Sequence, residues 1–204
     1  MLNDNSSINL SSFSLDRMGV KKPITAGTYL YKFSDSDVFY TKEETKITGS
    51  YLFYEKGKPV PKEGDPIETE YFVRVSPYWA RISDLYNLLH YSKNSNKSLL
   101  ECVRNRNAVL HNWNGLNSLL IIKLKETVLG WEGGIREQTE KNYDDWKKRR
   151  GYSAPVKVWG GGSQVVIPNL TRRHIEVVVP AETVYIRDPI EDIIDFLEGY
   201  KQIV

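Results

Sequence analysis

Only one cysteine, Cys102, occurs in this sequence, so no disulfide can form within the chain. The first residues are polar and rich in Ser and Asn, without the basic start and apolar core of a secretion signal. Long apolar runs are missing too, because the longest spans only 119–122 and is far too short to cross a bilayer. These absences predict a protein that works in a reducing cytoplasm and has no membrane partner.

Charge of one sign is also missing, since 28 Lys and Arg residues stand against 26 Asp and Glu residues, a net charge of +2. Dedicated nucleic-acid binders usually carry a larger positive excess. Two short basic runs stand out locally, one at 147–150 and one at Arg172 and Arg173. Each run is expected to be either a solvated face or a phosphate contact, and the sequence leaves that choice open.

Motifs for several common chemistries are absent as well. His90, His111 and His174 lack the spacing to Cys or Asp that a zinc site requires. The glycines at 160–162 are followed by Ser-Gln, without the lysine of a phosphate-binding loop. No serine lies in a Gly-x-Ser-x-Gly pattern, and Cys102 is expected to be a packed thiol. We therefore predict no metal cofactor.

A length of 204 residues fits one domain that buries its own core. Residues 1–25 show little periodicity and are predicted to form a loose arm ahead of a single domain at 26–204. Because strands follow one another more often than they alternate with helices, the predicted class is α+β. The strands, which are β-branched and aromatic runs between turn residues, are predicted at 28–33, 51–54, 70–75, 119–124, 128–131, 163–168, 175–179 and 183–186.

The strongest helix signal begins at Ser98, where Ser98 and Glu101 have the spacing of a capping box. The helix is predicted to extend to 118, with one apolar face formed by Leu99, Val103, Leu110, Trp113 and Leu120. A second helix is predicted near the end of the chain, where Asp188 supplies an N-cap and Pro189 the first helical position. Its apolar positions are Ile193, Ile194 and Leu197.

Polar segments fill two of the gaps between these elements. Residues 56–68 contain prolines and glycines among charges and are expected to form a surface loop. Residues 135–150 are dense in charge and are expected to form a surface helix or a lid. Gln164 is the one polar residue in an apolar run after the glycines, so it is expected to face solvent, a backbone partner or a cleft.

The stretch Gly160-Gly161-Gly162-Ser163-Gln164, followed by Val-Val-Ile-Pro, resembles the last motif of ADP-ribosyltransferases. It is similar to the Gly-Gly-Gly-Thr-Gln of one branch of secreted bacterial toxins that cleave NAD⁺. The resemblance implies split antiparallel β-sheets with flanking helices, NAD as substrate and no metal. Gln164 occupies the place of the catalytic Glu, Lys32 that of an Arg, and Ser76 matches the Ser of the family's middle strand.

The resemblance also implies a role for each of these residues. Lys32 would clamp the pyrophosphate, with Arg74 or Arg81 in reserve, and Tyr78 and Trp79 would stack on nicotinamide. Gln164 would hold the ribose hydroxyl while an oxocarbenium-like cation forms, although an amide cannot act as a base. The implied NAD-binding set is Tyr31, Lys32, Ser76, Tyr78, Trp79 and Gly162, with Gln164 as the catalytic residue. ADP-ribose would pass to water or to a macromolecule such as a protein or a nucleic acid, and an immunity protein or antitoxin would neutralise the toxin.

Two other functions fit the sequence. A non-enzymatic module of a toxin, phage or defence system would bind RNA or protein through the polar face of the 98–118 helix and the 147–150 run. A nuclease or other hydrolase would use His111 with Glu101 and Arg104.

Overall fold

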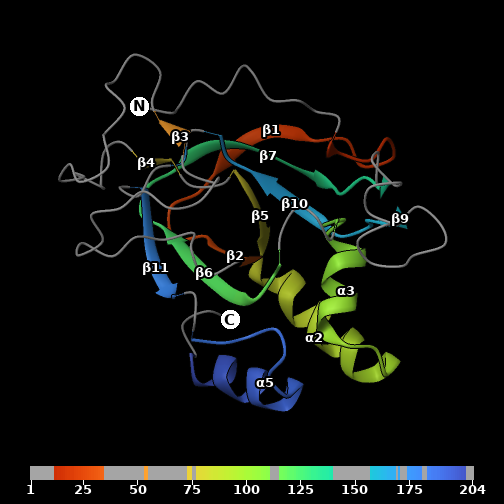
Figure 1. Ribbon diagram of the computed structural model, residues 1–204. Helices are drawn as coiled ribbons and strands as arrows, with labels where there is room; N and C mark the ends of the chain where they lie inside the picture. Colours follow the sequence, from red (N-terminus) through yellow and green to blue (C-terminus); the bar gives the residue numbers. More distant parts are fainter. Residues whose placement is uncertain are drawn as a thin grey trace.

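A computed structural model describes residues 12–34, 53–54, 73–74, 77–110, 115–139, 157–168, 170, 174–180 and 183–200. These residues form a mixed α+β structure, as predicted, in which three helices accompany a seven-stranded sheet (Figure 1). Among the described residues, no helix has the length and apolar character needed to span a membrane.

The main sheet has the strand order β1-β7-β10-β5-β2-β6-β11, and neighbouring strands pair antiparallel. Strands that are distant in the sequence therefore lie side by side, as Figure 1 shows for β10 between β7 and β5. The strands are β1 (Val20–Ile24), β2 (Tyr29–Ser34), β5 (Tyr78–Arg81), β6 (Ser118–Leu124), β7 (Val128–Gly134), β10 (Ser163–Val166) and β11 (Ile175–Val179). Two small pairs lie apart from it, β3 (Phe53–Tyr54) with β4 (Val73–Arg74), and β8 (Gln138–Thr139) with β9 (Lys157–Val158).

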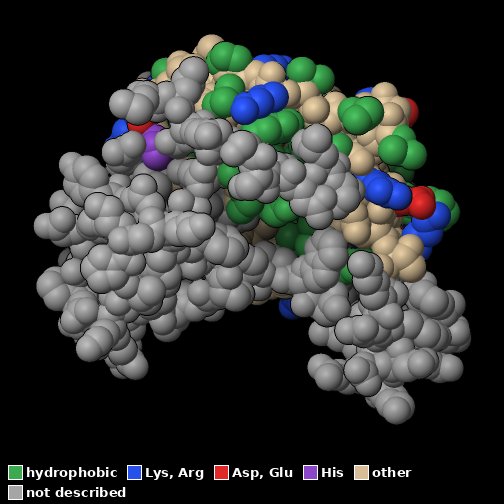
Figure 2. All heavy atoms as spheres, turned by 90° about the horizontal axis from the view of Figure 1, so that it is seen from above, with side chains coloured by type: hydrophobic (Ala, Val, Ile, Leu, Met, Phe, Trp, Pro, Cys, Tyr) green, Lys and Arg blue, Asp and Glu red, His purple; other side chains and the backbone are tan. Residues whose placement is uncertain are grey.

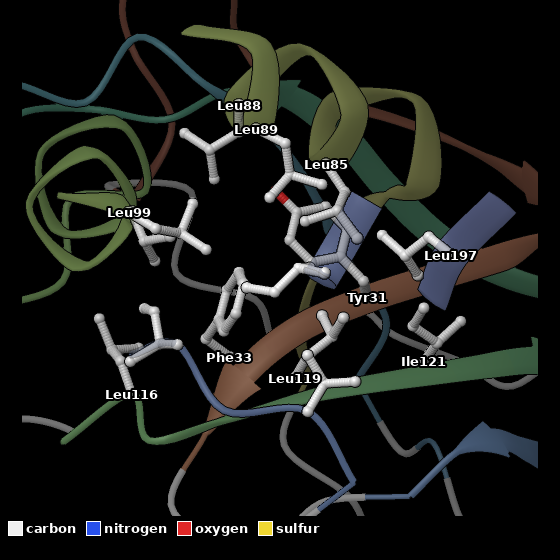
Figure 3. Close-up of a cluster of buried hydrophobic side chains, with 14 of the residues drawn as sticks. Tyr31, Phe33, Leu85, Leu88, Leu89, Leu99, Leu116, Leu119, Ile121 and Leu197 are labelled. Carbon is white, nitrogen blue, oxygen red and sulfur yellow. The ribbon is translucent and has the colours of Figure 1, made fainter. Parts of the chain in front are cut away.

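One face of the sheet, here called the helical face, is covered by α2 (Ile82–Ser95), α3 (Leu99–Arg106) and α5 (Ile190–Gly199). Tyr31 and Phe33 of β2 point toward the leucines of these helices (Figure 3). Each helix contributes an apolar stripe, because positions three and four apart lie on the same side. The buried cluster includes Leu85, Leu88, Leu89, Leu99, Val103, Leu119, Ile121, Ile193 and Leu197.

The opposite face carries a second apolar cluster. It includes Leu30, Trp79, Leu120, Ile122 and Val165, which alternate along their strands with the residues of the helical face. In the view of Figure 2, the Lys and Arg side chains of the described residues lie at separate places rather than in one continuous basic patch.

Several predicted elements are confirmed. The strands expected at 28–33, 119–124, 128–131, 163–168 and 175–179 correspond to β2, β6, β7, β10 and β11. The helix at Ser98 begins as predicted, because the Ser98 hydroxyl accepts a hydrogen bond from the Glu101 amide at 3.3 Å. Ile193 and Leu197 are buried on α5, as expected. Of the strands expected at 51–54 and 70–75, only residues 53–54 and 73–74 are described, as β3 and β4.

Other expectations are wrong. The helix from Ser98 ends at Arg106, and Ala108 has a φ of +50°, so Leu110 and Leu120 do not belong to it. The sequence does not predict α2, the longest of the described helices, because Arg81 precedes it and offers no side-chain cap. Residues 183–186 form no strand, although Tyr185 makes a single bridge to Ser118. Asp188 does not cap α5 but accepts a hydrogen bond from the amide of Tyr185.

The N-terminal segment also differs from the loose arm expected at 1–25. Residues 20–24 form β1, which pairs with β7 from Val20 to Ile24. Before it, Phe13 bridges to Ile135, and its ring is buried. The described part of this arm is therefore integral to the sheet, and the boundary expected at residue 25 falls at the end of a strand.

Candidate functional site

The glycine turn, residues 160–162, is held between α3 and the chain that follows β7. The amide of Gly160 donates to the carbonyl of Asn105 at 2.8 Å, and that of Gly161 to the carbonyl of Ile135 at 3.1 Å. Gly160 has a φ of +70°, and a Cβ there would lie only 2.5 Å from the Ile135 oxygen. Glycine is required here because only glycine combines a positive φ with such close approach. The turn thus fixes where β10 begins.

Arg17 of the N-terminal segment reaches the outer side of this turn. Its Nη2 donates to the carbonyl of Gly161 at 2.7 Å and lies 3.2 Å from that of Gly162. The backbone around Arg17 is fixed as well, because its carbonyl accepts the amide of Gly134 at 2.8 Å. A Cβ at Gly134 would come within 2.6 Å of the Arg17 Nε, so glycine at this position makes room for the guanidinium. A guanidinium has five N–H donors, and Arg17 remains exposed.

Gln164 lies on β10 and is 6% exposed. Its Nε2 donates to the backbone oxygen of Ser12 at 2.8 Å and lies 3.4 Å from the Ser12 hydroxyl. Within the described ranges, its amide oxygen receives no hydrogen bond. Gln164 was expected to face solvent, a backbone partner or a cleft, and the structure shows a backbone partner. Its side-chain oxygen can still accept a hydrogen bond.

A group of titratable side chains lies where α2 begins and α3 ends, on the helical face of the sheet. Burial raises the pKa of Asp84 in the first turn of α2, and the nearby charge of Arg106 opposes this rise most strongly. The charge of Arg17 also acts on Asp84. Burial raises the pKa of Tyr31 as well, and its phenol is hydrogen-bonded to the side chain of Asn107. The start of α2 therefore holds one perturbed carboxyl within reach of the charges of two arginines.

Lys32 and Trp79 lie on the opposite face of the sheet from Gln164. The Lys32 Nζ is 4.9 Å from the centre of the Trp79 ring, and Trp79 is only 3% exposed. Trp79 pairs with Val165, which is adjacent to Gln164, and successive residues of a strand point to opposite faces. Burial lowers the pKa of Lys32 to about 7. The structure does not bring the predicted clamp, Lys32, to the face of Gln164.

The other predicted site residues are divided between the two faces. Tyr78 is 50% exposed and lies on the face of Gln164, whereas Trp79 is a core residue, so the two do not form one stacking surface. Tyr31 is buried under α2, with its ring 6.1 Å from that of Phe33. Gly162 belongs to the turn itself, and its amide donates to the carbonyl of Arg106 at 3.0 Å.

Of the reserve cations, Arg81 is engaged in an ion pair with Glu132, with its Nε 2.6 Å from the carboxylate. Arg74 lies in β4. Ser76, the basic runs at 147–150 and at 172–173, the 56–68 loop and His111 lie outside the described residues. In the part of the chain that is described, no group of His, Cys, Asp or Glu is arranged to hold a metal ion.

Sequence reasoning missed Arg17 and Asp84. Arg17 is separated from its partners in the turn by 144 and 145 residues, so no local pattern indicates the contact. The available signal was weak, because Asp16 and Arg17 are the only charged residues between Asp4 and Lys21.

No known protein family, curated protein or solved structure matches this chain.

Proposed function

We propose that this protein cleaves the nicotinamide–ribose bond of NAD⁺ as a toxin of the ADP-ribosyltransferase type, with the split-sheet fold of that family. The proposal is supported above all by the contact of Arg17 with the glycine turn that precedes Gln164. A cation is thereby held beside the start of the strand that carries Gln164. The cation and the amide of Gln164 suit a substrate that has a charged pyrophosphate beside a ribose.

In this proposal Arg17 takes the role that the sequence suggested for Lys32. Two negative phosphates need a donor with several N–H groups, and a guanidinium offers a planar fork that an ammonium lacks. Arg17 is exposed and uses Nη2 on the turn, so its other donors can reach a ligand. Lys32 instead packs over Trp79, on the face opposite Gln164.

Gln164 would orient the ribose. Its Nε2 is occupied by the Ser12 carbonyl, which fixes the amide plane and leaves the oxygen to accept from a ribose hydroxyl. Holding the sugar in place lowers the entropic part of the barrier as the bond to nicotinamide breaks. The departing nicotinamide leaves positive charge on the ribose, as in glycoside cleavage. Among the aromatic residues that the resemblance assigns to NAD binding, Tyr78 is exposed and lies on the face of Gln164.

Gln164 cannot remove a proton from an acceptor, so another group must do so. Asp84 fits this role because it lies in the first turn of α2, within reach of the charge of Arg17, and because burial raises its pKa, which makes its carboxylate more basic than an ordinary one. The acceptor is then water or a hydroxyl or amine of a macromolecule. A toxin of this kind would be kept inactive in its own cell by an immunity protein or antitoxin.

The direct test is nicotinamide release from NAD⁺ by the purified full-length chain. The wild type is expected to release nicotinamide, and Gln164→Ala to reduce the rate at least about 100-fold. Asn94→Ala, which removes an exposed amide from α2, is the matched control and should keep the wild-type rate. Thermal unfolding of both variants shows whether the fold persists. A folded wild type that leaves NAD⁺ intact, with and without protein and RNA acceptors, contradicts the proposal.

A further inference from the structure

A hollow of about 450 Å³ lies beside the glycine turn, between α2, α3 and the start of the turn. Its wall includes Gly160, the first glycine of the turn whose later carbonyls hold Arg17. Strand β9 and α3 are in contact next to it (Figure 1). The volume lies within the range of pockets that take small organic ligands. Nothing in the proposed cleavage of NAD⁺ uses this hollow.

Two large aromatic side chains stand at the hollow and are well exposed. Trp159 is 66% exposed and Tyr91 48% exposed, and both contribute to its wall. The Lys157 Nζ is 4.5 Å from the centre of the Trp159 ring and also pairs with Glu137 at 2.8 Å. An exposed indole in the wall of a pocket is suited to stacking against a flat ring.

Cations complete the wall. Lys97, at the corner between α2 and α3, and Arg106, at the end of α3, both border the hollow. Within the described ranges, neither side chain forms an ion pair, although the charge of Arg106 also acts on Asp84. One carboxylate, that of Glu101, lies on the same wall, which leaves an excess of positive charge. A ligand with one or more negative groups therefore fits the electrostatics.

Asn105 adds a polar group for recognition. Its Nδ2 donates to the backbone oxygen of Glu101 at 3.1 Å, which fixes the amide and leaves Oδ1 free to accept from a base edge. Aromatic surface, an oriented amide and two cations together match the flat face of a base, the polar edge of that base and the phosphate of a nucleotide. An acidic peptide would use the cations but not the stacking surface, and an uncharged sugar would not use the cations.

We propose that this hollow is a nucleotide-binding pocket, in which the base stacks on Trp159 and the phosphate contacts Lys97 and Arg106. The shared chemistry allows two sources, a free adenine nucleotide or a nucleotide of a single-stranded nucleic acid. The pocket does not depend on the proposed cleavage of NAD⁺, since AMP has no nicotinamide bond.

The test is equilibrium binding of AMP to the full-length chain by titration calorimetry, alongside a short single-stranded oligoadenylate. AMP is expected to bind, and Trp159→Ala to weaken binding roughly 10-fold, as loss of one stacked base does. Lys97→Ala should weaken it roughly fivefold and flatten its salt dependence. Tyr185→Ala removes an exposed aromatic elsewhere and should change nothing. Trp159→Phe keeps a ring and should retain most of the affinity, which separates stacking from misfolding.

Comparing AMP with oligoadenylate shows whether the pocket takes a free nucleotide or a nucleotide of a nucleic acid. Oligoadenylate that binds at least 10-fold more tightly than AMP, with the same loss in Trp159→Ala, assigns the pocket to nucleic acid. Equal affinities assign it to a free nucleotide. The proposal is overturned if neither ligand binds at concentrations up to about 10 mM, where even weak pockets fill. It is equally overturned if binding is the same in Trp159→Ala as in the wild type. NAD⁺ cleavage can succeed or fail without affecting either result.

Discussion

Arg81 on β5 and Glu132 on β7 form an ion pair with two hydrogen bonds, which crosses the intervening strand β10. The Arg81 Nε and Nη2 donate to the two carboxylate oxygens at 2.6 and 2.8 Å, bridging β5 and β7 over β10. The Lys22 Nζ joins from β1 at 2.8 Å. The pair therefore fastens the strand that carries Gln164 from both sides. Because its geometry is bidentate, it is more specific than an ordinary surface ion pair.

Glu132→Gln is expected to destabilise the protein at pH 7 by about 1 kcal/mol, since the site is partly open to solvent. Arg81 above all, with Lys22, lowers the pKa of Glu132 to about 2. A lowered pKa means that the stabilisation is complete above the unfolded value of 4.5 and fades as the pH falls toward 2. Urea unfolding at a series of pH values should show the wild type and the variant converging in that window.

Glu198→Gln, at an exposed position of α5, is the control for the loss of a carboxylate. It should leave the free energy of unfolding nearly unchanged at pH 7. A difference between Glu132→Gln and the wild type that stays constant down to pH 2 would show that the ion pair is not the cause.

Gly160→Ala and Gly161→Ala form a matched pair at adjacent positions. Both glycines have positive φ, +70° and +87°, but only Gly160 has a backbone oxygen, that of Ile135, in the space of a Cβ. Gly161 has nothing within 4 Å. Gly161→Ala should thus cost about 1 kcal/mol from backbone strain, and Gly160→Ala about 2–4 kcal/mol. Denaturant unfolding measures both, and equal costs would mean that the turn is not clamped against Ile135.

The contrast between α3 and α2 shows what the sequence could and could not predict. Ser98 and Glu101 lie three residues apart, and a local spacing of that kind is enough to start α3. Its end depends on a distant segment, because the carbonyls of Asn105 and Arg106 accept amides of the glycine turn. The stripe of α2 has Ser92 as a buried member, which weakened the apolar pattern.

The site divides in the same way. The turn and strand around Gln164 were predictable, since glycines and an apolar run are local signals. Period-two alternation puts Lys32 on the face opposite Tyr31, but the sequence does not tell which of those faces Gln164 shares. That depends on the register of Trp79 with Val165. The contact of Arg17 with the turn likewise depends on tertiary structure.

Lys32→Met is expected to stabilise the protein most near neutral and acidic pH. Burial lowers the pKa of Lys32 from 10.5 to about 7, so the folded state binds fewer protons than the unfolded state between these values. Stability therefore rises with pH across that window in the wild type. Methionine removes the cost of burying the charge, although the contact with the Trp79 ring is also lost. Unfolding at about pH 6 and at about pH 10 should show a larger gain at the lower pH.

Lys123→Met is the control for that experiment, because Lys123 is also a strand lysine over an aromatic ring, 5.3 Å from that of Tyr29. The difference in free energy of unfolding between Lys123→Met and the wild type should not grow at low pH as it does for Lys32→Met. If the two variants respond to pH in the same way, burial of Lys32 is not what shapes the profile.

Arg17→Lys tests the proposed clamp. A lysine retains the charge but cannot reach the turn and a phosphate with one rigid fork, so kcat/KM for NAD⁺ is expected to fall at least about 10-fold. Arg187→Lys, at an exposed position, should leave the rate unchanged. Steady-state nicotinamide release measures both variants. An Arg17→Lys variant with wild-type kinetics would show that Arg17 does not bind the pyrophosphate of NAD⁺.

Asp84→Asn tests the proposed proton acceptor. Because burial raises the pKa of Asp84, the wild-type rate should fall on the acid side at a pH above that of an ordinary Asp. Asparagine cannot take a proton, so kcat should drop by about 100-fold or more, with KM nearly unchanged, and the acid limb of the pH profile should disappear. Asp195→Asn, on an exposed position of α5, should keep both the rate and the limb. An acid limb that persists unchanged in Asp84→Asn would assign proton removal to another group, even if the variant is slow, because a purely structural loss lowers the whole profile without changing its shape.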